Sequence, residues 1–205
     1  MRDSAVKRIL TKLGLTGEPD LIRLEIGQPK SWSSKYPDVP APDSKLSIQL
    51  VAAAWASHDV YGEEMPSIAA SLIESGLDSP ALRRLAAETS AKCSADVADL
   101  VAKMFREFNV PCPLPEKQAR LIITRQIARE VIAGERDLER AADYLETVIW
   151  GPDWNPPNEN LGTIFALYDE RKWDPEHQRF GSLITEDLLD AFARLARLTD
   201  KEILT

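Results

Sequence analysis

The sequence contains few of the residues that most often bind metals, form disulfides or act as nucleophiles and bases. Its 205 residues include two cysteines, Cys93 and Cys112, and two histidines, His58 and His177. Two cysteines do not indicate a disulfide framework. Such a low cysteine content is typical of proteins from a reducing compartment. The sequence also lacks the Gly-x-Gly-x-x-Gly, Walker A and Gly-x-Ser-x-Gly patterns, so no motif supports nucleotide binding or hydrolase activity.

Long apolar stretches are missing as well. No apolar run approaches the roughly 18 residues that a membrane-spanning helix requires. The first residues are basic, but Lys7, Arg8 and Lys12 interrupt the apolar segment that a secretory signal would need. We therefore expect a cytoplasmic protein that does not enter a membrane.

Basic residues are too few to balance the acidic ones, and the formal net charge is −8. Residues 51–100 hold 8 acids and 3 bases, and residues 151–205 hold 11 acids and 6 bases. Proteins that bind nucleic acids usually carry a basic stripe that supplies most of the affinity. Apart from the short N-terminal segment, no such stripe occurs here, so we expect no nucleic-acid binding.

Apolar residues spaced three and four apart are abundant, and this is the period of amphipathic helices. Capping residues, prolines and glycines mark where such helices begin and end. We expect helices that begin near Asp43 or Ser44, at Pro66, after Ser79, after a Ser94 cap, after Asp137 and after a Thr185 cap.

The segment 116–133 differs from the other predicted helices because apolar residues surround most of its circumference. Its main polar seam consists of Gln118, Arg125 and Arg129. A helix that is apolar on most sides is buried on most sides. We therefore expect residues 116–133 to form the central helix of the fold.

Three segments show other patterns. Residues 21–27 alternate between apolar and polar side chains, which predicts a strand. Residues 28–42 contain four prolines and no helical period, which predicts an irregular loop. Residues 160–172 fit either a helix or a strand, and we favour a helix. The patterns together predict an all-α single domain over residues 1–205, or a mainly α domain with one short strand pair.

Residues 150–160, WGPDWNPPNEN, form an unusual loop with two of the five tryptophans and three of the fourteen prolines. The loop does not fit a calcium site, because Pro157 occupies a ligand position. Two interpretations stay open: a stiff connector whose tryptophans pack on the central helix, or a recognition loop whose tryptophans anchor a partner. In the second interpretation the binding residues are Trp150, Asp153, Trp154, Asn158 and Glu159.

The two histidines are candidate metal ligands because carboxylates lie near each of them in the sequence. The neighbours of His58 are Asp59, Glu63 and Glu64, and those of His177 are Asp174 and Glu176. Such a site could hold Mn, Fe or Zn. Metal-binding helices usually show His-x-x-x-His or Glu-x-x-His spacing, however, and neither occurs. We therefore expect solvated acidic loops, with no metal ligand and no cofactor.

The two cysteines are the candidate nucleophiles. Cys93 lies where a helix is expected to begin, and a helix N-terminus can lower the pKa of a thiol. Cys112 lies in a Pro-Cys-Pro turn. Neither cysteine has a histidine nearby in the sequence to act as a base. Structural or incidental thiols are favoured, and no catalytic residue is expected.

Two stretches, AAAWASHDVYGEEMPSIAASLIESGLDSPALRRLAAE and IAREVIAGERDLERAADYL, resemble segments of uncharacterised acidic helical proteins from bacteria. The resemblance implies a bacterial cytosolic protein and transfers no catalytic residue. The acidic composition itself suits a basic protein partner, which electrostatic complementarity would select. We therefore predict a non-catalytic interaction protein, for example an immunity or inhibitor protein. The alternative is a small metal-dependent enzyme that uses His58 or His177.

Overall fold

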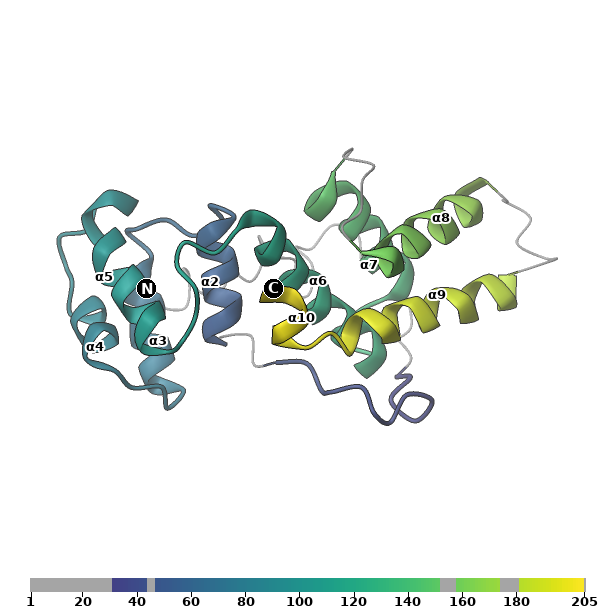
Figure 1. The fold of residues 1–205 in the computed structure, drawn as a ribbon, viewed down its shortest axis with the longest axis horizontal. Coiled ribbons are helices and arrows are strands. Elements are labelled where there is room, and N and C mark those ends of the chain that lie inside the picture. The colour runs from purple at the N-terminus through teal and green to yellow at the C-terminus, as the bar shows by residue number, and fades with distance from the viewer. Residues whose placement is uncertain (1–30, 44–46, 152–157, 174–180, 205) are drawn as a thin grey trace, which may run out of the picture. The chain divides into compact units, whose positions relative to one another are not determined.

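The structure is a computed structural model that describes residues 31–43, 47–151, 158–173 and 181–204. These residues form helices joined by turns and loops, without a strand among them (Figure 1). In chain order the helices are α2 (Ile48–Ala56), α3 (Met65–Glu74), α4 (Pro80–Ala86), α5 (Ser94–Glu107), α6 (Glu116–Ala133), α7 (Leu138–Tyr144), η1 (Leu145–Trp150), α8 (Glu159–Trp173), α9 (Gly181–Ala196) and α10 (Asp200–Leu204). The predicted all-α class is confirmed, whereas the strand predicted at residues 21–27 lies outside the described residues.

The described residues group into two compact units. Unit 1 contains the described residues from Asp43 to Ile123, and unit 2 contains residues 31–42 and those from Thr124 onward. Helix α6 therefore contributes its first half to unit 1 and its second half to unit 2. The single domain expected over residues 1–205 stays a prediction.

Helix α6 has the predicted bounds, Glu116–Ala133, and every residue from Leu121 to Ile132 is buried. The predicted polar seam is buried too at Arg125 and Arg129. Gly134 ends the helix with a φ of 78°, a left-handed conformation that glycine adopts without strain. The prediction that this segment is surrounded by other parts of the chain is confirmed.

In unit 1, α3 packs against α4 and α4 packs against α5. Short local signals fix where these helices begin. The hydroxyl groups of Ser47 and Ser79 accept hydrogen bonds from the amides of Leu50 and Leu82, each at 3.2 Å. A serine in this position satisfies an amide of the first turn that has no partner within its own helix.

Helix α3 ends in a Schellman turn at Gly76, and a glycine directly after an apolar helical stripe is the sequence signal for such an end. The φ of Gly76 is 96°. The amide of Leu77 donates to the carbonyl of Leu72 at 3.1 Å, and the amide of Gly76 donates to that of Ile73 at 2.9 Å. These two bonds satisfy the last carbonyl groups of the helix and turn the chain directly into α4.

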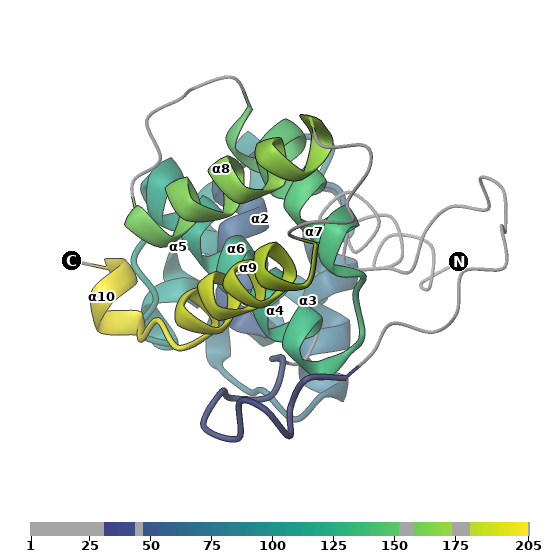
Figure 2. The ribbon, with the colours of Figure 1, turned by 90° about the vertical axis from the view of Figure 1, so that its right-hand side faces the viewer.

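In unit 2, α8 and α9 lie side by side and antiparallel, and α7 packs on α8 (Figures 1 and 2). Residues 31–42 form the irregular segment that was expected, and polar contacts join it to α9 and the residue that follows it. The guanidinium of Arg197 donates to both carboxylate oxygens of Asp38 at 2.7 and 2.8 Å. The hydroxyl of Tyr36 donates to Asp190. These side-chain contacts help to hold residues 31–42, which have no regular secondary structure, against unit 2.

Three predicted helix starts were wrong. Helix α2 begins at Ile48 rather than near Asp43 or Ser44, because Ser47 caps it. The cap of α5 is Cys93, and the expected cap, Ser94, is the first residue of the helix. Helix α9 begins at Gly181, so Thr185 lies inside it. In the last two cases the hydroxyl residue that suggested a cap belongs to the first turns of a helix that starts earlier.

Helix α10 was not predicted, although its cap has a recognisable pattern. Thr199 is followed three residues later by Glu202. The Thr199 hydroxyl accepts from the amide of Glu202 at 3.3 Å, and the Glu202 carboxylate accepts from the amide of Thr199 at 2.7 Å. This reciprocal pair is a capping box, and it starts a helix of one turn.

The segment η1 is a π-helix, which no sequence pattern predicted. A regular α-helix would have continued the apolar stripe of Leu145, Val148 and Ile149. Hydrogen bonds to the fifth residue along the chain give more residues per turn, so Leu145 and Trp150 share the buried side. Val148 turns outward and is 60% exposed.

Candidate functional site

Trp150, the first residue of the predicted binding loop, belongs to the core of unit 2. Its side chain is 7% exposed, and its indole Nε1 donates to the hydroxyl of Thr124 on α6 at 3.0 Å. A buried tryptophan needs such an acceptor for its N–H group. For Trp150, the interpretation as packing on the central helix fits the contacts, and a role as an exposed anchor does not.

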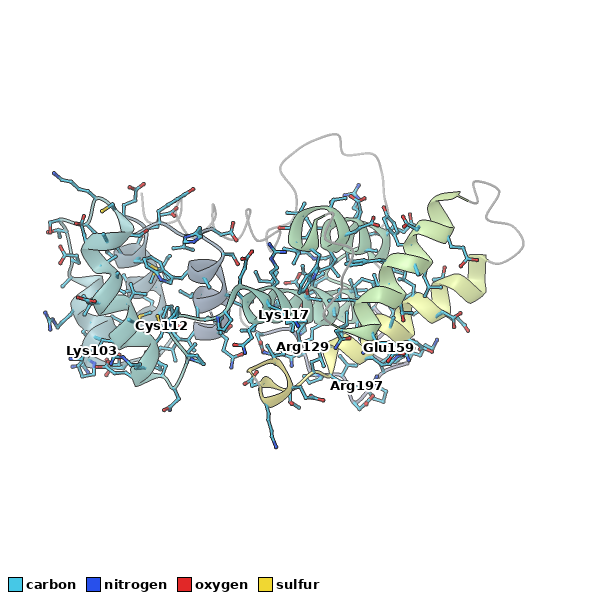
Figure 3. All side chains as sticks on the ribbon, turned by 45° about the horizontal axis from the view of Figure 1, so that its top comes forward. Lys103, Cys112, Lys117, Arg129, Glu159 and Arg197 are labelled. Atoms are coloured by element: carbon cyan, nitrogen blue, oxygen red, sulfur yellow. The ribbon has the colours of Figure 1, made fainter. Side chains whose placement is uncertain are left out.

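The other predicted binding residues fall at the start of α8 or outside the described residues. Asn158 caps α8, because its side-chain oxygen accepts from the amide of Asn160 at 2.8 Å. Glu159 is exposed in the first turn of α8 (Figure 3), where a carboxylate interacts favourably with the helix dipole. Asp153 and Trp154 lie outside the described residues, so their part in recognition stays a prediction.

His58, the described candidate metal ligand, occupies a backbone position that ends α2. Its φ is 57°, and the amide of the following Asp59 donates to the carbonyl of Ala54 at 2.9 Å. In the described part of the chain, no group of three or more histidine, cysteine, aspartate or glutamate residues is arranged to hold a metal ion. His177, the other candidate, lies outside the described residues.

The two cysteines are in unit 1 and have different surroundings. Cys93 is exposed at the start of α5. Cys112 is half-buried between two prolines (Figure 3), and burial raises the pKa of its thiol, while Arg106 lowers it by a smaller amount. A thiol with a raised pKa is a poorer nucleophile at neutral pH. These surroundings give Cys112 no feature of an activated nucleophile.

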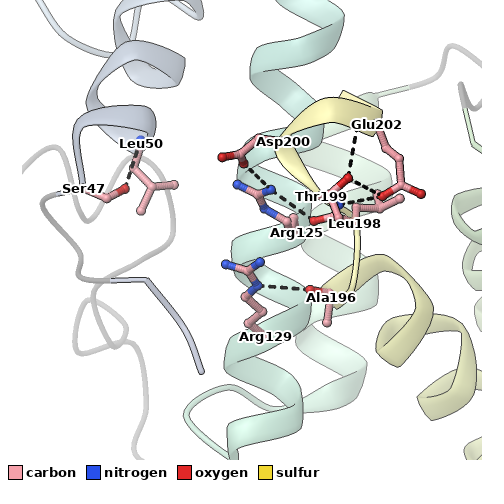
Figure 4. Close-up of polar contacts among 9 residues, drawn as sticks. All are labelled: Ser47, Leu50, Arg125, Arg129, Ala196, Leu198, Thr199, Asp200 and Glu202. Atoms are coloured by element: carbon pink, nitrogen blue, oxygen red, sulfur yellow. Dashed lines mark hydrogen bonds and ion pairs between the residues drawn. The ribbon is translucent and has the colours of Figure 1, made fainter. Parts of the chain in front are cut away.

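Arg125 and Arg129 form a buried polar face on the second half of α6 (Figure 4). Arg129 Nε donates to the carbonyl of Ala196 at 3.1 Å, and Arg125 Nη1 donates to the carbonyl of Leu198 at 3.1 Å. Arg125 also pairs with Asp200 at 2.7 Å. Cations at the C-terminal end of a helix stabilise its dipole and satisfy its last carbonyl groups. This face therefore connects α6 to the α9–α10 turn and has a structural role.

Glu130 and Gln126 extend this polar face, again with structural contacts. Gln126 Nε2 donates to Glu130 Oε1 at 3.1 Å, and Arg136 Nε donates to Glu130 Oε2 at 2.9 Å. The backbone carbonyl of Glu130 accepts from the amides of Glu135 and Arg136 at 2.8 and 3.3 Å. The network thus closes the turn that follows α6. A buried carboxylate is stable only when it is paired in this way.

A shallow groove lies on unit 1. It has a volume of about 260 Å³ and is open to solvent. One wall comes from the start of α3 and the residue two before it, and the other from the end of α4 and the chain that follows. The lining residues are Glu63, Pro66, Ser67, Ala70, Ala86, Glu88, Thr89 and Ala91.

The two walls are held together by a close backbone contact beside the groove. The amide of Gly62 donates to the hydroxyl of Ser94 at 3.1 Å. A Cβ atom at Gly62 would lie 2.2 Å from the carbonyl oxygen of Cys93, so a larger residue would not fit without a backbone shift. The chain segments that carry Glu63 and Ala91 are consequently fixed next to each other.

The charge of the groove is negative. Glu63 and Glu88 both line it, and none of the lining residues is a lysine or an arginine. The hydroxyl and amide of Ser90 donate to Glu88 Oε1 at 2.6 and 2.8 Å, which holds the pKa of that carboxyl below its usual range. Glu88 therefore stays ionised throughout the neutral range. The alanine and serine side chains that line the groove are small.

In the sequence, Glu63 stands out only as a carboxylate near His58, and no pattern marks Glu88. The carboxylates are separated by α3 and α4, so their proximity depends on how these helices pack. Gly62 carries a weak signal, because a glycine outside a helix often marks a place where two stretches of backbone approach each other closely. The positions of the alanines carry no such signal, because alanine is common in any helix.

The chain matches no protein-family model and no curated protein, and no solved structure matches it. Among the described residues, no helix has both the length and the apolar composition needed to cross a membrane.

Proposed function

We propose that this protein is a non-catalytic interaction protein of the bacterial cytoplasm that binds a basic protein partner. The observation that carries the proposal is the groove of unit 1, which Glu63 and Glu88 both line and to which no lysine or arginine contributes. The net charge of the chain, −8, also favours a basic partner, and it acts over a longer distance than the groove does. An acidic protein attracts basic partners and repels acidic ones before contact.

An immunity or inhibitor protein is one concrete form of this function. Such a protein acts by occupying a surface of its partner, so it requires a stable fold and a complementary charge but no catalytic group. The helical framework of unit 1 suits this role, because buried residues of α3, α4 and α5 hold the groove in place. A preformed surface loses little entropy on binding.

The test is capture of a partner by the tagged full-length chain, followed by kinetic measurements with that partner purified. We expect a partner with a basic isoelectric point, and an association rate constant that falls steeply as the salt concentration rises, because salt screens the attraction between opposite charges. A specific partner that is neutral or acidic, with an association rate that does not depend on salt, would contradict the proposal.

A further inference from the structure

We propose that residues 31–42, here called the strap, release from unit 2 as one segment while α9 stays folded. The strap contains turns but neither helix nor strand (Figure 1). A segment with little buried apolar surface opens more readily than the helices against which it lies. This inference goes beyond the proposed function and does not depend on it.

Burial within the strap is concentrated at one side chain. Tyr36 is 7% exposed, whereas the other residues of 31–42 are half-buried or exposed. In α9, by contrast, Leu188, Leu189 and Phe192 are all fully buried. Burial of apolar surface is the main force that holds such a segment in place. Release of the strap therefore costs much less free energy than unfolding of α9.

Four polar side chains interlock around this single anchor. The hydroxyl of Tyr36 donates to Asp190 on α9, and the guanidinium of Arg197 donates to both carboxylate oxygens of Asp38 at 2.7 and 2.8 Å. Burial and the bond to Asp190 raise the pKa of Tyr36, so its hydroxyl donates throughout the neutral range. The guanidinium carbon of Arg197 lies 5.9 Å from the centroid of the Tyr36 ring. Arg197 thus contacts the strap twice, through a bidentate ion pair and a cation–π contact.

The ion pair closes the strap without locking it. The side chains of Arg197 and Asp38 are 37% and 64% exposed. An exposed ion pair contributes little stability, and salt screens it. The balance between closed and open strap therefore responds to small changes in these contacts.

Some backbone bonds of the strap are internal and can persist after release. The amides of Tyr36 and Val39 donate to the carbonyls of Trp32 and Tyr36 at 3.2 and 3.1 Å. The amide of Trp32 and the hydroxyl of Ser33 donate instead to the carbonyl of Ile132, in the last turn of α6, at 2.8 and 3.3 Å. Release breaks these last two bonds, so the amide of Trp32 reports directly on the closed state.

The two states differ in the charges that α9 and the residue after it present. In the closed state, Asp190 and Arg197 are paired with Tyr36 and Asp38. In the open state both groups lose these pairings, while the helix that positions them is unchanged. The strap is therefore an autoinhibitory cover over a charged face of unit 2.

Amide hydrogen exchange of the isotope-labelled full-length chain, followed by NMR, measures how readily each segment opens. After correction for intrinsic rates, the amide of Trp32 should exchange at least about ten-fold faster than those of Leu188 and Phe192 in α9. It should still exchange more slowly than a free amide, because the strap is closed most of the time.

Variants test the anchors separately. Tyr36→Phe keeps the ring and should speed exchange at Trp32 about ten-fold, the effect of losing a hydrogen bond to a charged group. Arg197→Gln should speed it about two- to five-fold, the range for an exposed ion pair. Both variants should leave the α9 amides unchanged. The matched control is Arg194→Gln, an exposed arginine whose Nε donates within α9 to the carbonyl of Asp190 at 3.3 Å, and it should leave the exchange at Trp32 unchanged.

Equal exchange at Trp32 and in α9 would show that the strap opens only with the whole unit, and it would overturn the proposal. An unprotected Trp32 amide would overturn it too, because the strap would then not be closed. The same holds if Tyr36→Phe or Arg197→Gln leaves the exchange at Trp32 unchanged, or speeds exchange in α9 equally. A cooperative melt of each variant confirms that it is folded. None of these results bears on the proposed function, which is tested by capture of a partner.

Discussion

Among the residues that the structure describes, two other than glycine have a left-handed backbone, and each ends a helix of unit 1. His58 has a φ of 57° after α2, and Asn109 has a φ of 58° after α5. After Asn109, the amide of Val110 donates to the carbonyl of Phe105 at 2.9 Å. This bond corresponds to the one that the amide of Asp59 donates to Ala54 after His58. This position usually holds glycine, because a Cβ atom costs about 1–2 kcal/mol there. The backbone thus accounts for the position of His58 without a metal.

We predict that His58→Gly raises the free energy of unfolding by about 0.5–1 kcal/mol, because relief of the left-handed strain exceeds the greater chain entropy of glycine. Asn109→Gly should gain less, since asparagine tolerates this conformation better than histidine does. Urea denaturation measures both. His58→Ala, which removes the imidazole but keeps the Cβ atom, is the control and should give no gain. Equal stability of the glycine and alanine variants would show that strain is not the cause.

Among the elements, α6 is the one on which both units depend. Ile123 is 1% exposed at the end of its unit 1 half, and a buried, unpaired charge costs several kcal/mol. That is comparable with the whole stability of a domain. We predict that Ile123→Asp abolishes the cooperative thermal transition followed by circular dichroism. Lys117→Asp, in the exposed first turn of the same helix, should melt like the parent. A normal melt of Ile123→Asp would contradict the central position of α6.

Helices with strong local signals were predicted well, because those signals act within a few residues. The bounds of α6 and the turn at Gly76 depend on prolines, glycines and apolar spacing, and the structure confirms both. The π-helix was missed because no local pattern marks it, and its last residue, Trp150, donates to Thr124, which lies 26 residues away in the sequence. Burial of Arg125 was likewise not predictable, since it depends on the carbonyl of Leu198.

The candidate site was the least predictable feature, for a related reason. The two tryptophans of residues 150–160 made this loop a candidate binding site on composition alone, yet Trp150 forms part of the core. The groove is lined by ordinary residues from two stretches of the chain, and only the packing of α3 and α4 places them around one groove. Composition identifies unusual side chains, whereas a site made of common ones requires the tertiary structure.

At the scale of the whole molecule, carboxylates that cap helices or bind arginine occur in both units. In unit 1, the amides of Lys92 and Cys93 hold the pKa of Asp96 below its usual range. In unit 2, the amide and hydroxyl of Thr199 lower the pKa of Glu202. Hydrogen bonds to the charged form favour ionisation, so each group releases its proton more readily in the folded chain than in the unfolded one.

This difference sets the direction of the pH dependence. A carboxyl whose folded pKa is lowered contributes stability above its unfolded pKa and loses that contribution as pH falls through the folded pKa. The ordinary pKa values are 4.5 for glutamate and 3.8 for aspartate. We therefore predict a melting temperature that is nearly constant from about pH 7 to 5 and decreases below about pH 4.5.

The variant Asp96→Ala assigns part of that decrease to one carboxyl. Its melting temperature should be lower than that of the parent at pH 7, and the two curves should converge as pH falls, because the parent then loses the bonds that the variant never had. Asp99→Ala, an exposed change on the same helix, should run parallel to the parent at every pH. Scanning calorimetry across the acid range measures all three chains. If the Asp96→Ala and parent curves stayed parallel down to the lowest pH, the cap of α5 would not contribute to acid sensitivity, and the loss of stability would have to arise from the other carboxylates.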